Sequence, residues 1–345
     1  MSELISGIQQ VGIGVRNAQE AFSWYNKTLG LNVPLFDDVA EATLMTRHTN
    51  GNIRQRRAIL ALNMAGGGGA EIWQSNRPEP LAPNFEPQIG DLGIFAVKIK
   101  STDVRQFAQN QGLTTTQTPE SKPTAWLKDS YGNPLQIVSD DSWFKANESL
   151  TGGVIGVVIG VSDIDKALKL YKDVLQINEL VYDKTGSFED FSTLDAQNKQ
   201  FRRVLLRKTM TNNGAFSRLL GNVEVELVQA LDRTPKTIFE GRSWGDLGFI
   251  HVCFDTLDMD ALEKRCAANG FPFTVDSADT FAMGKAGGRF TYIEDPDGTL
   301  IEFVETHKVP ILKKIGWYLD LKKRKTQKPL PDWMVSTMGW GKVKA

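Results

Sequence analysis

Two ionisable residues stand inside apolar segments, where a solvated side chain is not expected. His251 lies in the segment GFIHVCF, and the alternation of side chains along a strand places it on one face with Phe249 and Cys253. Glu302 lies in TLIEFVE, on one face with Leu300 and Val304. An imidazole or a carboxylate that faces a core is costly unless it is hydrogen-bonded or binds a metal. For the histidine alone, a hydrogen-bonded structural role is the simpler interpretation and a metal-ligand role is the functional one.

Other polar or flexible positions give weaker signals. Glu71 in AEIWQ could be exposed on an edge strand, and Gln10 could be an ordinary polar strand residue. Two cysteines, Cys253 and Cys266, cannot supply a disulfide framework or a thiolate zinc site. No helix with a Lys-Ser/Thr start follows Gly66–Gly69, so we interpret this run as a flexible hairpin connection and not as a phosphate-binding loop.

The elements that must position these residues come from an internal repeat. The segment GIQQVGIGVRNAQEAFSWYNKTLGL from Gly7 aligns with GVIGVVIGVSDIDKALKLYKDVLQI from Gly153. Each reads as a strand, a short polar turn and a helix with apolar residues at helical spacing. Asn17 and Ser162, each with an acidic residue three positions later, resemble the first residues of capping boxes.

A second repeat follows each copy of the first. DLGIFAVKIKSTDVRQFAQNQG from Asp91 aligns with DLGFIHVCFDTLDMDALEKRCAANG from Asp246, and all four units close on an apolar strand. The order is therefore A-B-A′-B′, a duplicated pair of modules. It predicts one pair at residues 1–145, a second pair at 146–307, and a basic C-terminal extension at 308–345.

The bulk composition argues against several classes of protein. The chain has 345 residues, 41% of them hydrophobic, and a formal net charge of −1, which gives no general attraction to nucleic acid or acidic membranes. No window approaches the roughly 18 uninterrupted apolar residues of a transmembrane helix, and MSELISGIQQ lacks the features of a secretory signal. We therefore expect a cytoplasmic protein with a small-molecule substrate and with no nucleic-acid or membrane partner.

These repeats resemble the vicinal oxygen chelate superfamily, which includes glyoxalase I, bleomycin-resistance proteins and extradiol dioxygenases. The resemblance covers about residues 7–306, and its most specific pieces are the strand–helix openings and EDPDGTLIEFVE from Glu294. It implies an α+β fold in which four βαβββ modules form two half-open β-barrels. It also implies a metal ion inside a barrel, held by side chains from the middle of the first and the last strand of each module.

How the modules pair decides which site exists. By the resemblance, the ligand positions of the four modules are, in order, Gln10 and Glu71, Ala96 and Gln136, Gly156 and Glu226, and His251 and Glu302. Pairing of neighbours would leave each barrel incomplete. In the tandem fusions of glyoxalase I the first module pairs with the fourth, which here collects Gln10, Glu71, His251 and Glu302 in one barrel. We favour this pairing because it gathers the ligands; the other barrel then holds a set that binds a metal poorly.

The gathered set defines the expected chemistry. One imidazole, two carboxylates and an amide oxygen suit Zn²⁺, Ni²⁺, Co²⁺, Mn²⁺ or Fe²⁺. A metal that binds a carbonyl or enolate oxygen lowers the pKa of the adjacent carbon acid. By resemblance to glyoxalase I, Glu302 and Glu71 are the candidate catalytic bases. The leading hypothesis is a metal-dependent lyase or isomerase that acts on a small oxygenated substrate through an enolate.

Two alternatives belong to other functional classes. A ring-cleaving Fe(II) dioxygenase would use two histidines and a carboxylate, but its first histidine falls at Gly156. A metal-free binding protein, like the bleomycin-resistance proteins, would tolerate loss of His251. Within the enzyme hypothesis, Gly14 and Ser75 stand where glyoxalase I has an arginine and an asparagine, which argues against a glutathione adduct as substrate.

The remaining candidates rest on position alone. His48 could line a substrate pocket but reads more simply as a surface strand residue, and His307 should point away from Glu302 if the strand continues. Residues expected near the fourth module's barrel are Trp244, Lys285, Arg289 and Tyr292. The segment from Lys308 has apolar residues at spacings that predict a short amphipathic helix in a basic arm.

Overall fold

The computed structural model describes residues 2–146, 149–278, 281–283, 286–312, 317–322, 324 and 327–344. Four βαβββ modules follow one another along the chain. The first contains β1 (Ile5–Val15), α1 (Ala18–Leu29), β2 (Val33–Glu41), a 3-10 turn (Thr43–His48), β3 (Gln55–Leu62) and β4 (Gly69–Arg77). The second contains β5 (Gly93–Ser101), α2 (Val104–Gln111), β6 (Thr115–Gln117), β7 (Pro123–Lys128) and β8 (Pro134–Ser139).

The third and fourth modules repeat this order. The third contains β9 (Thr151–Gly160), α3 (Ile164–Leu168) with a π-helical continuation (Lys169–Val174), β10 (Glu179–Gly186), a 3-10 turn (Glu189–Leu194), β11 (Phe201–Lys208), α4 (Ser217–Leu220) and β12 (Val223–Ala230). The fourth contains β13 (Gly248–Thr256), α5 (Met259–Ala268), β14 (Val275–Asp276), β15 (Phe281–Met283), β16 (Ala286–Glu294) and β17 (Leu300–Leu312). A tail follows with β18 (Trp317–Asp320), α6 (Asp332–Ser336) and a 3-10 turn (Thr337–Gly341).

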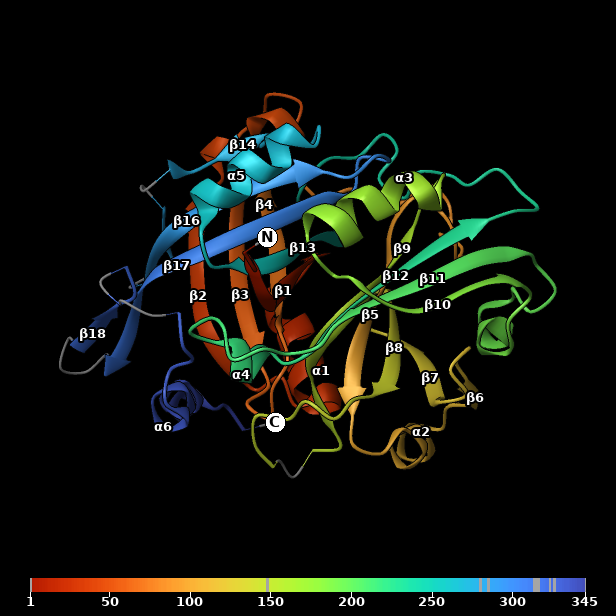
Figure 1. The fold of residues 1–345 in the computed structure, drawn as a ribbon, viewed down its shortest axis with the longest axis horizontal. Helices are drawn as coiled ribbons and strands as arrows, with labels where there is room; N and C mark the ends of the chain where they lie inside the picture. Colours follow the sequence, from red (N-terminus) through yellow and green to blue (C-terminus); the bar gives the residue numbers. More distant parts are fainter. Residues whose placement is uncertain are drawn as a thin grey trace.

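The first module pairs with the fourth and the second with the third. One sheet runs β14-β16-β17-β13-β1-β4-β3-β2, and the other runs β10-β11-β12-β9-β5-β8-β7-β6. Antiparallel contacts of β1 with β13 and of β5 with β9 join the modules. In Figure 1 the red and orange strands of the first module accordingly lie on the same side of the molecule as the teal and blue strands of the fourth. The expected fold class, with two half-open barrels, is confirmed, and so is the favoured pairing.

Most helix ends follow the sequence signals. Asn17 caps α1 by accepting hydrogen bonds from the backbone of Gln19 and Glu20, and Gly30 closes the helix in the left-handed conformation with φ of 65°. The expected cap at Ser162 is wrong by one residue. Asp163 caps α3 instead, accepting from the backbone N–H of Lys166.

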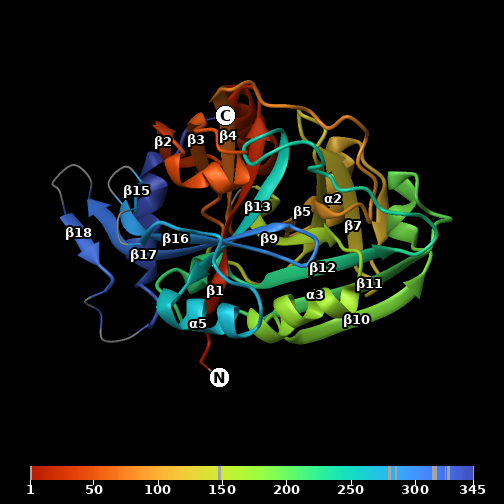
Figure 2. The ribbon, with the colours of Figure 1, turned by 90° about the horizontal axis from the view of Figure 1, so that it is seen from above.

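One large core joins the two barrels. Apolar faces of α1, α2, α3 and α5 pack into it together with alternate residues of the inner strands. Figure 2 shows the two sheets side by side from above. Gly66–Gly69 lies where they touch, since a Cβ at Gly67 would come within 2.7 Å of the backbone of Gly153. The run is buried and makes backbone hydrogen bonds with Val154 and Leu219. Its glycines therefore do more than form the expected flexible hairpin connection, because the absence of side chains lets two backbones approach closely.

The tail differs from the sequence-based expectation. β17 continues through Leu312 and pairs with β18 as an antiparallel hairpin, so the predicted amphipathic helix does not form in the described part of the segment. Residues 313–316 lie outside the described chain. Among the residues that the structure describes, no helix is both long and apolar enough to cross a membrane.

Candidate metal centre

Three ionisable side chains converge inside the barrel of the first and fourth modules. Ligand atoms of Glu71 on β4, His251 on β13 and Glu302 on β17 all lie within 4.8 Å of one another. His251 Nε2 lies 3.0 Å from an oxygen of Glu302 and 3.4 Å from an oxygen of Glu71. All three residues are buried, with His251 fully enclosed. Residues from opposite ends of the chain therefore meet at one point.

Gln10 completes the group from β1. In strand register Gln10 stands opposite Cys253, and Cys253 stands opposite Glu302. The side-chain amide of Gln10 donates a 3.0 Å hydrogen bond to Glu71 Oε2, while its own oxygen faces no hydrogen-bond partner among the described residues. All four sequence-predicted ligand residues therefore lie together.

Several of these buried polar atoms lack the partners that protein structures normally provide. Gln10 Oε1, His251 Nε2 and Glu302 Oε2 have no hydrogen-bond partner within the described part of the chain. The 3.0 Å approach of His251 to Glu302 is an ion-pair distance without hydrogen-bond geometry. Three buried polar atoms without hydrogen-bond partners in the described chain, gathered in and beside a Glu/His/Glu cluster, are the kind of donor set that a divalent cation satisfies, so the residues fit a metal.

The electrostatics of His251 reflect the two carboxylates. Burial lowers the pKa of its imidazole, but Glu302 and Glu71 outweigh burial and raise the pKa to about 9. In the metal-free protein a proton on His251 therefore balances part of the negative charge. A divalent cation would take over that role by displacing the proton.

The neighbours of His251 fix its ring. The hydroxyl of Tyr292 lies 3.4 Å from His251 Nδ1, and the two rings meet edge to face at 5.5 Å between centroids. Burial, followed by the charges of Glu302 and Glu71, raises the pKa of Tyr292 well above 10, so its hydroxyl stays protonated. Tyr292 was expected near the barrel from position alone, and it contacts the imidazole atom that faces away from the cluster.

Gly12 is a functional position that the sequence analysis missed. It lies in register between His251 on one side and Glu71 on the other. A Cβ at Gly12 would lie 2.4 Å from His251 Cε1, so only glycine leaves room for the imidazole. A glycine inside a strand is the signal that could have identified it, because such glycines often mark close approach of another group.

Phe249 does not share a strand face with His251, as simple alternation of side chains had predicted. A β-bulge separates the pairs Gly12–His251 and Ile13–Phe249. Phe249 consequently packs in the main core on the helix side of the sheet, not beside His251. The extra residue in the bulge shifts the side-chain alternation.

The walls around the cluster are largely aromatic. Trp73 and Trp244 meet edge to face at 4.5 Å, and they pack with Met45 and Tyr292 in one apolar cluster. Both indole N–H groups are buried without a hydrogen-bond partner among the described residues. Trp244 was predicted to lie near this barrel, and the structure places it there.

The two departures from glyoxalase I have structural explanations. A side chain at Gly14 would bring its Cβ to 1.9 Å from the backbone oxygen of Asp246. Ser75 accepts a 3.2 Å hydrogen bond from Arg54, whose guanidinium also pairs with Asp246 at 2.8 Å. The positive charge of Arg54 is thus already neutralised by Asp246.

The other position-based candidates do not join the donor set, although the ring of His48 lies 6.3 Å from the ring of Tyr292. His48 ends a 3-10 turn rather than a strand, bonds Thr274 at 3.0 Å, and has its pKa lowered by burial. Arg289 pairs with three acidic residues near α5. His307 lies on β17 beyond the cluster and contacts Glu305 at 3.1 Å. Lys285 lies outside the described residues.

Part of the chain matches a known protein family. Residues 157–292 match the model of the glyoxalase/bleomycin resistance protein/dioxygenase superfamily, which is the vicinal oxygen chelate superfamily. The match spans the third module and most of the fourth. No curated protein sequence matches the chain significantly.

Solved structures share the fold of the chain. A proposed dioxygenase from Bacillus subtilis superposes with a TM-score of 0.55 at 13% identity, over 88% of this chain and 86% of that one. A mutant of glyoxalase I from Zea mays gives a TM-score of 0.50 at 12% identity, over 87% of this chain and 93% of that one. At such identities these likenesses establish the fold and carry no information on the reaction.

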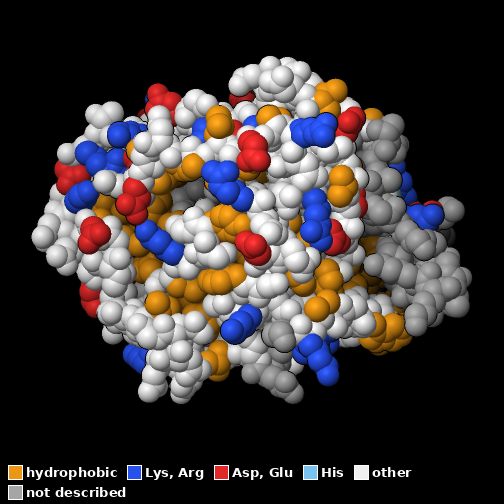
Figure 3. Space-filling model, turned by 180° about the vertical axis from the view of Figure 1, so that it is seen from behind, with side chains coloured by type: hydrophobic (Ala, Val, Ile, Leu, Met, Phe, Trp, Pro, Cys, Tyr) orange, Lys and Arg blue, Asp and Glu red, His pale blue; other side chains and the backbone are white. Residues whose placement is uncertain are grey.

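The second barrel has a different interior. Its ligand positions are Ala96, Gln136, Gly156 and Glu226, as expected from the pairing. A Cβ at Gly156 would lie 2.5 Å from the backbone of Glu224, so this position has no room for a histidine. In Figure 3, hydrophobic side chains gather in a hollow on the side formed by the second and third modules.

Basic side chains occupy the second barrel near Glu226. Arg203 reaches Glu226 at 2.5 Å and Asp190 at 2.7 Å, and Lys98 lies 2.8 Å from Glu226. Burial raises the pKa of Glu226, but Arg203 and Lys98 outweigh it and lower the pKa to about 2. The guanidinium and ammonium groups supply the positive charge that a metal would bring. The sequence analysis predicted the weak ligand set but not these cations.

Proposed function

We propose that this chain is a divalent-metal-dependent enzyme that transfers a proton on a small oxygenated substrate, as a lyase or an isomerase, with the metal held by Gln10, Glu71, His251 and Glu302. The observation that supports the proposal is the buried convergence of Glu71, His251 and Glu302. Gln10 is hydrogen-bonded to Glu71, and its own amide oxygen has no hydrogen-bond partner among the described residues. The donor set suits Zn²⁺, Ni²⁺, Co²⁺, Mn²⁺ or Fe²⁺.

A divalent cation held by these donors supplies Lewis acidity, which stabilises negative charge on a substrate oxygen. Glu71 and Glu302 are held differently, which indicates different roles in proton transfer. Gln10 tethers Glu71 by a hydrogen bond, whereas Glu302 Oε2 has no such tether among the described residues. The Glu302 side chain also keeps 10% of its surface exposed, twice the 5% of Glu71. We therefore assign proton abstraction to Glu302 and a supporting role to Glu71.

The surroundings support this assignment. Trp73 and Trp244 pack with Tyr292 beside the cluster, and a low-dielectric wall strengthens the interaction of a carboxylate base with a developing charge. Tyr292 holds the imidazole of His251 through Nδ1, which directs Nε2 toward the carboxylates. Each of these contributions comes from a side chain of the first or the fourth module.

The dioxygenase hypothesis receives less support. The cluster contains one histidine, and the position expected for another, Gly156, lies in the second barrel without space for a side chain. A two-histidine, one-carboxylate facial triad is therefore not assembled among the described residues.

Metal binding is the first test of the proposal. Untagged full-length protein, stripped with a chelator and reloaded separately with each candidate metal, should bind about one ion per chain by elemental analysis. His251→Ala should lower metal affinity at least about tenfold, because an inner ligand is lost. His307→Ala serves as the matched control, since it removes a histidine that lies beyond the cluster and outside the donor set. Equal affinity in both variants would contradict the assignment.

Proton transfer is the second test. Enolisation can be assayed without knowing the substrate, by following exchange of carbon-bound hydrogen with deuterium oxide in a panel of hydroxyketones and ketoacids by NMR. Metal-loaded protein should accelerate exchange for some members, and Glu302→Gln should abolish the acceleration while keeping the protein folded. Exchange that Glu302→Gln leaves intact would refute the role of this base.

A further inference from the structure

The end of the C-terminal extension forms a short helical element on the surface of the first module. It consists of α6 and the 3-10 turn that follows, over residues 332–341. The inner side of this element is apolar: Val335 is 2% exposed, and Met334 and Met338 pack against a cluster that includes Leu62 of β3. Figure 1 shows α6 at the outer edge of the molecule.

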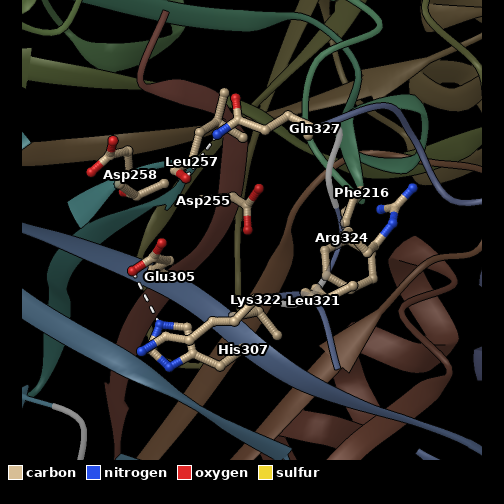
Figure 4. Close-up of a pocket in the computed structure, with 14 residues that line it drawn as sticks. Phe216, Asp255, Leu257, Asp258, Glu305, His307, Leu321, Lys322, Arg324 and Gln327 are labelled. Carbon is tan, nitrogen blue, oxygen red and sulfur yellow. Dashed lines mark hydrogen bonds and ion pairs between the residues drawn. The ribbon is translucent and has the colours of Figure 1, made fainter. Parts of the chain in front are cut away.

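Hydrogen bonds hold the element on both sides. Before it, the side chain of Gln327 donates a 3.1 Å hydrogen bond to the backbone oxygen of Leu257, which Figure 4 shows in the wall of a cavity. After it, the backbone N–H of Val343 donates a 2.9 Å hydrogen bond to Asn32, in the turn between α1 and β2. The outer side of this element is therefore held in a fixed place, unlike a frayed chain end.

Two tryptophans are exposed on that outer side. Trp333 keeps 58% of its surface exposed and Trp340 keeps 72%, and Val343 near the chain end keeps 42%. The two tryptophans are separated by about two helical turns, so both lie on the side of the element away from Val335. Tryptophan is mostly buried in folded proteins, and two exposed indoles on one ordered element therefore indicate a binding surface.

The charge around these indoles is positive. Lys328, Lys342 and Lys344 are exposed, and Asp332, the acidic residue of the segment 328–344, is paired with Arg218 at 3.0 Å. Residues 308–345 together contain ten Lys or Arg residues and two Asp residues. The net charge of −1 for the whole chain therefore averages a basic extension with a more acidic remainder.

The combination of tryptophan and lysine favours a lipid surface over a protein partner. Tryptophan is enriched at protein interfaces and at membrane surfaces alike, but lysine is depleted where two proteins meet. At a membrane surface, indole rings enter the headgroup region while lysines contact anionic headgroups. Lysines that follow Trp340 within a few residues fit the second case.

We propose that Trp333, Trp340, Lys342, Val343 and Lys344 form a Trp–Lys surface that binds an anionic lipid membrane. The contact is peripheral, since one side of a short element enters the headgroup layer while the other side stays packed on the first module. The expectation of no membrane partner rested on the charge of the whole chain, which does not describe this surface. The proposed contact is independent of the metal cluster.

The test is sedimentation of full-length protein with two kinds of large vesicle, one of phosphatidylcholine alone and one of phosphatidylcholine mixed with phosphatidylglycerol. The protein should bind the mixed vesicles and bind the neutral vesicles at least about tenfold more weakly, because lysines near an anionic surface add to affinity. Added salt should release the protein, because it screens exposed charges. Absence of binding to the mixed vesicles, or equal binding to both kinds, would overturn the proposal.

Replacement of the indoles assigns the binding to this surface. Trp333→Ala with Trp340→Ala should weaken binding to the mixed vesicles at least about tenfold, because both apolar anchors are lost. Leu180→Ala with Leu231→Ala is the matched control, since these leucines of the third module are 51% and 47% exposed. All four side chains are exposed, so both variants should fold. Unchanged binding in the tryptophan variant, or an equal loss in the leucine variant, would contradict the site.

Reversal of charge tests the role of the lysines. Lys342→Glu with Lys344→Glu should weaken binding to the mixed vesicles at least about tenfold, since each lysine near an anionic surface contributes about fivefold. Lys169→Glu with Lys264→Glu changes the net charge of the chain by the same amount at exposed positions of the third and fourth modules, and it should leave binding unchanged. An equal loss in both variants would refute a local contact.

Light scattering without lipid tests whether a second copy of the chain covers the indoles instead. The parent protein and the variant with Trp333→Ala and Trp340→Ala should have the same mass in solution. A parent dimer that this variant converts to a monomer would show that the Trp–Lys surface joins two chains, and it would overturn the proposal.

Discussion

Gly12→Ala perturbs the cluster without altering any proposed ligand. The added Cβ would lie 2.4 Å from His251 Cε1 and 2.8 Å from Nε2. Carbon atoms in contact stay about 3.5–4.0 Å apart, so the ring must move by at least about 1 Å. Metal–ligand distances tolerate only about 0.2 Å of variation, and a displaced ligand is therefore a poor one. We expect metal affinity to fall by about 10- to 100-fold, the range seen when support of a ligand is lost.

The assay is competition with a chromophoric chelator, accompanied by urea unfolding. Overpacking should also cost about 1–3 kcal/mol in the free energy of unfolding of the metal-free protein. Gly341→Ala is the control, since a Cβ there meets no atom within 4 Å. A folded Gly12→Ala protein whose metal affinity stays within about twofold of the parent would refute the inference that Gly12 makes room for a ligating imidazole.

Three other predictions follow from the same contacts. Tyr292→Phe should lower metal affinity about tenfold in chelator competition, because His251 loses its partner at Nδ1, whereas a purely packing role would leave the affinity unchanged. The thermal stability of the metal-free protein should fall as the pH rises from about 6.5, the ordinary histidine pKa, to about 9. The reason is that the raised pKa of His251 stabilises the folded state only while the imidazole is protonated. A pH scan of His251→Ala should show no such trend. Arg203→Met should cost about 3–5 kcal/mol in urea unfolding, because it leaves Glu226 and Asp190 buried with less counter-charge, while metal stoichiometry stays the same.

The sequence predicted the modules because their signals are local. Strand and helix openings repeat at similar spacing, and caps such as Asn17 act through residues within one helical turn. The sequence indicates the pairing of the first and fourth modules only indirectly, because that pairing places the four candidate ligands Gln10, Glu71, His251 and Glu302 in one barrel. Strand order confirms that pairing, although contacts between β1 and β13 leave no mark in the local sequence pattern.

The errors and omissions arise where distant segments decide the structure. The bulge that directs the side chain of Phe249 into the main core depends on the register of β1 against β13. The hairpin of β17 and β18 replaces a helix because the tail adds to a sheet edge, which local periodicity does not reveal. Arg203 and Lys98 reach Glu226 from two other strands, and no spacing rule links these residues in the sequence.

The proposed ligand set can be tested directly by X-ray diffraction at the absorption edge of a loaded metal. Crystals of full-length protein loaded with Mn²⁺, Co²⁺, Ni²⁺ or Zn²⁺ should give one strong anomalous peak within about 2.0–2.3 Å of His251 Nε2 and of carboxylate oxygens from Glu71 and Glu302, with the oxygen of Gln10 turned toward it. A protein that binds metal in solution but shows the peak elsewhere, or shows none between these side chains, would contradict the account.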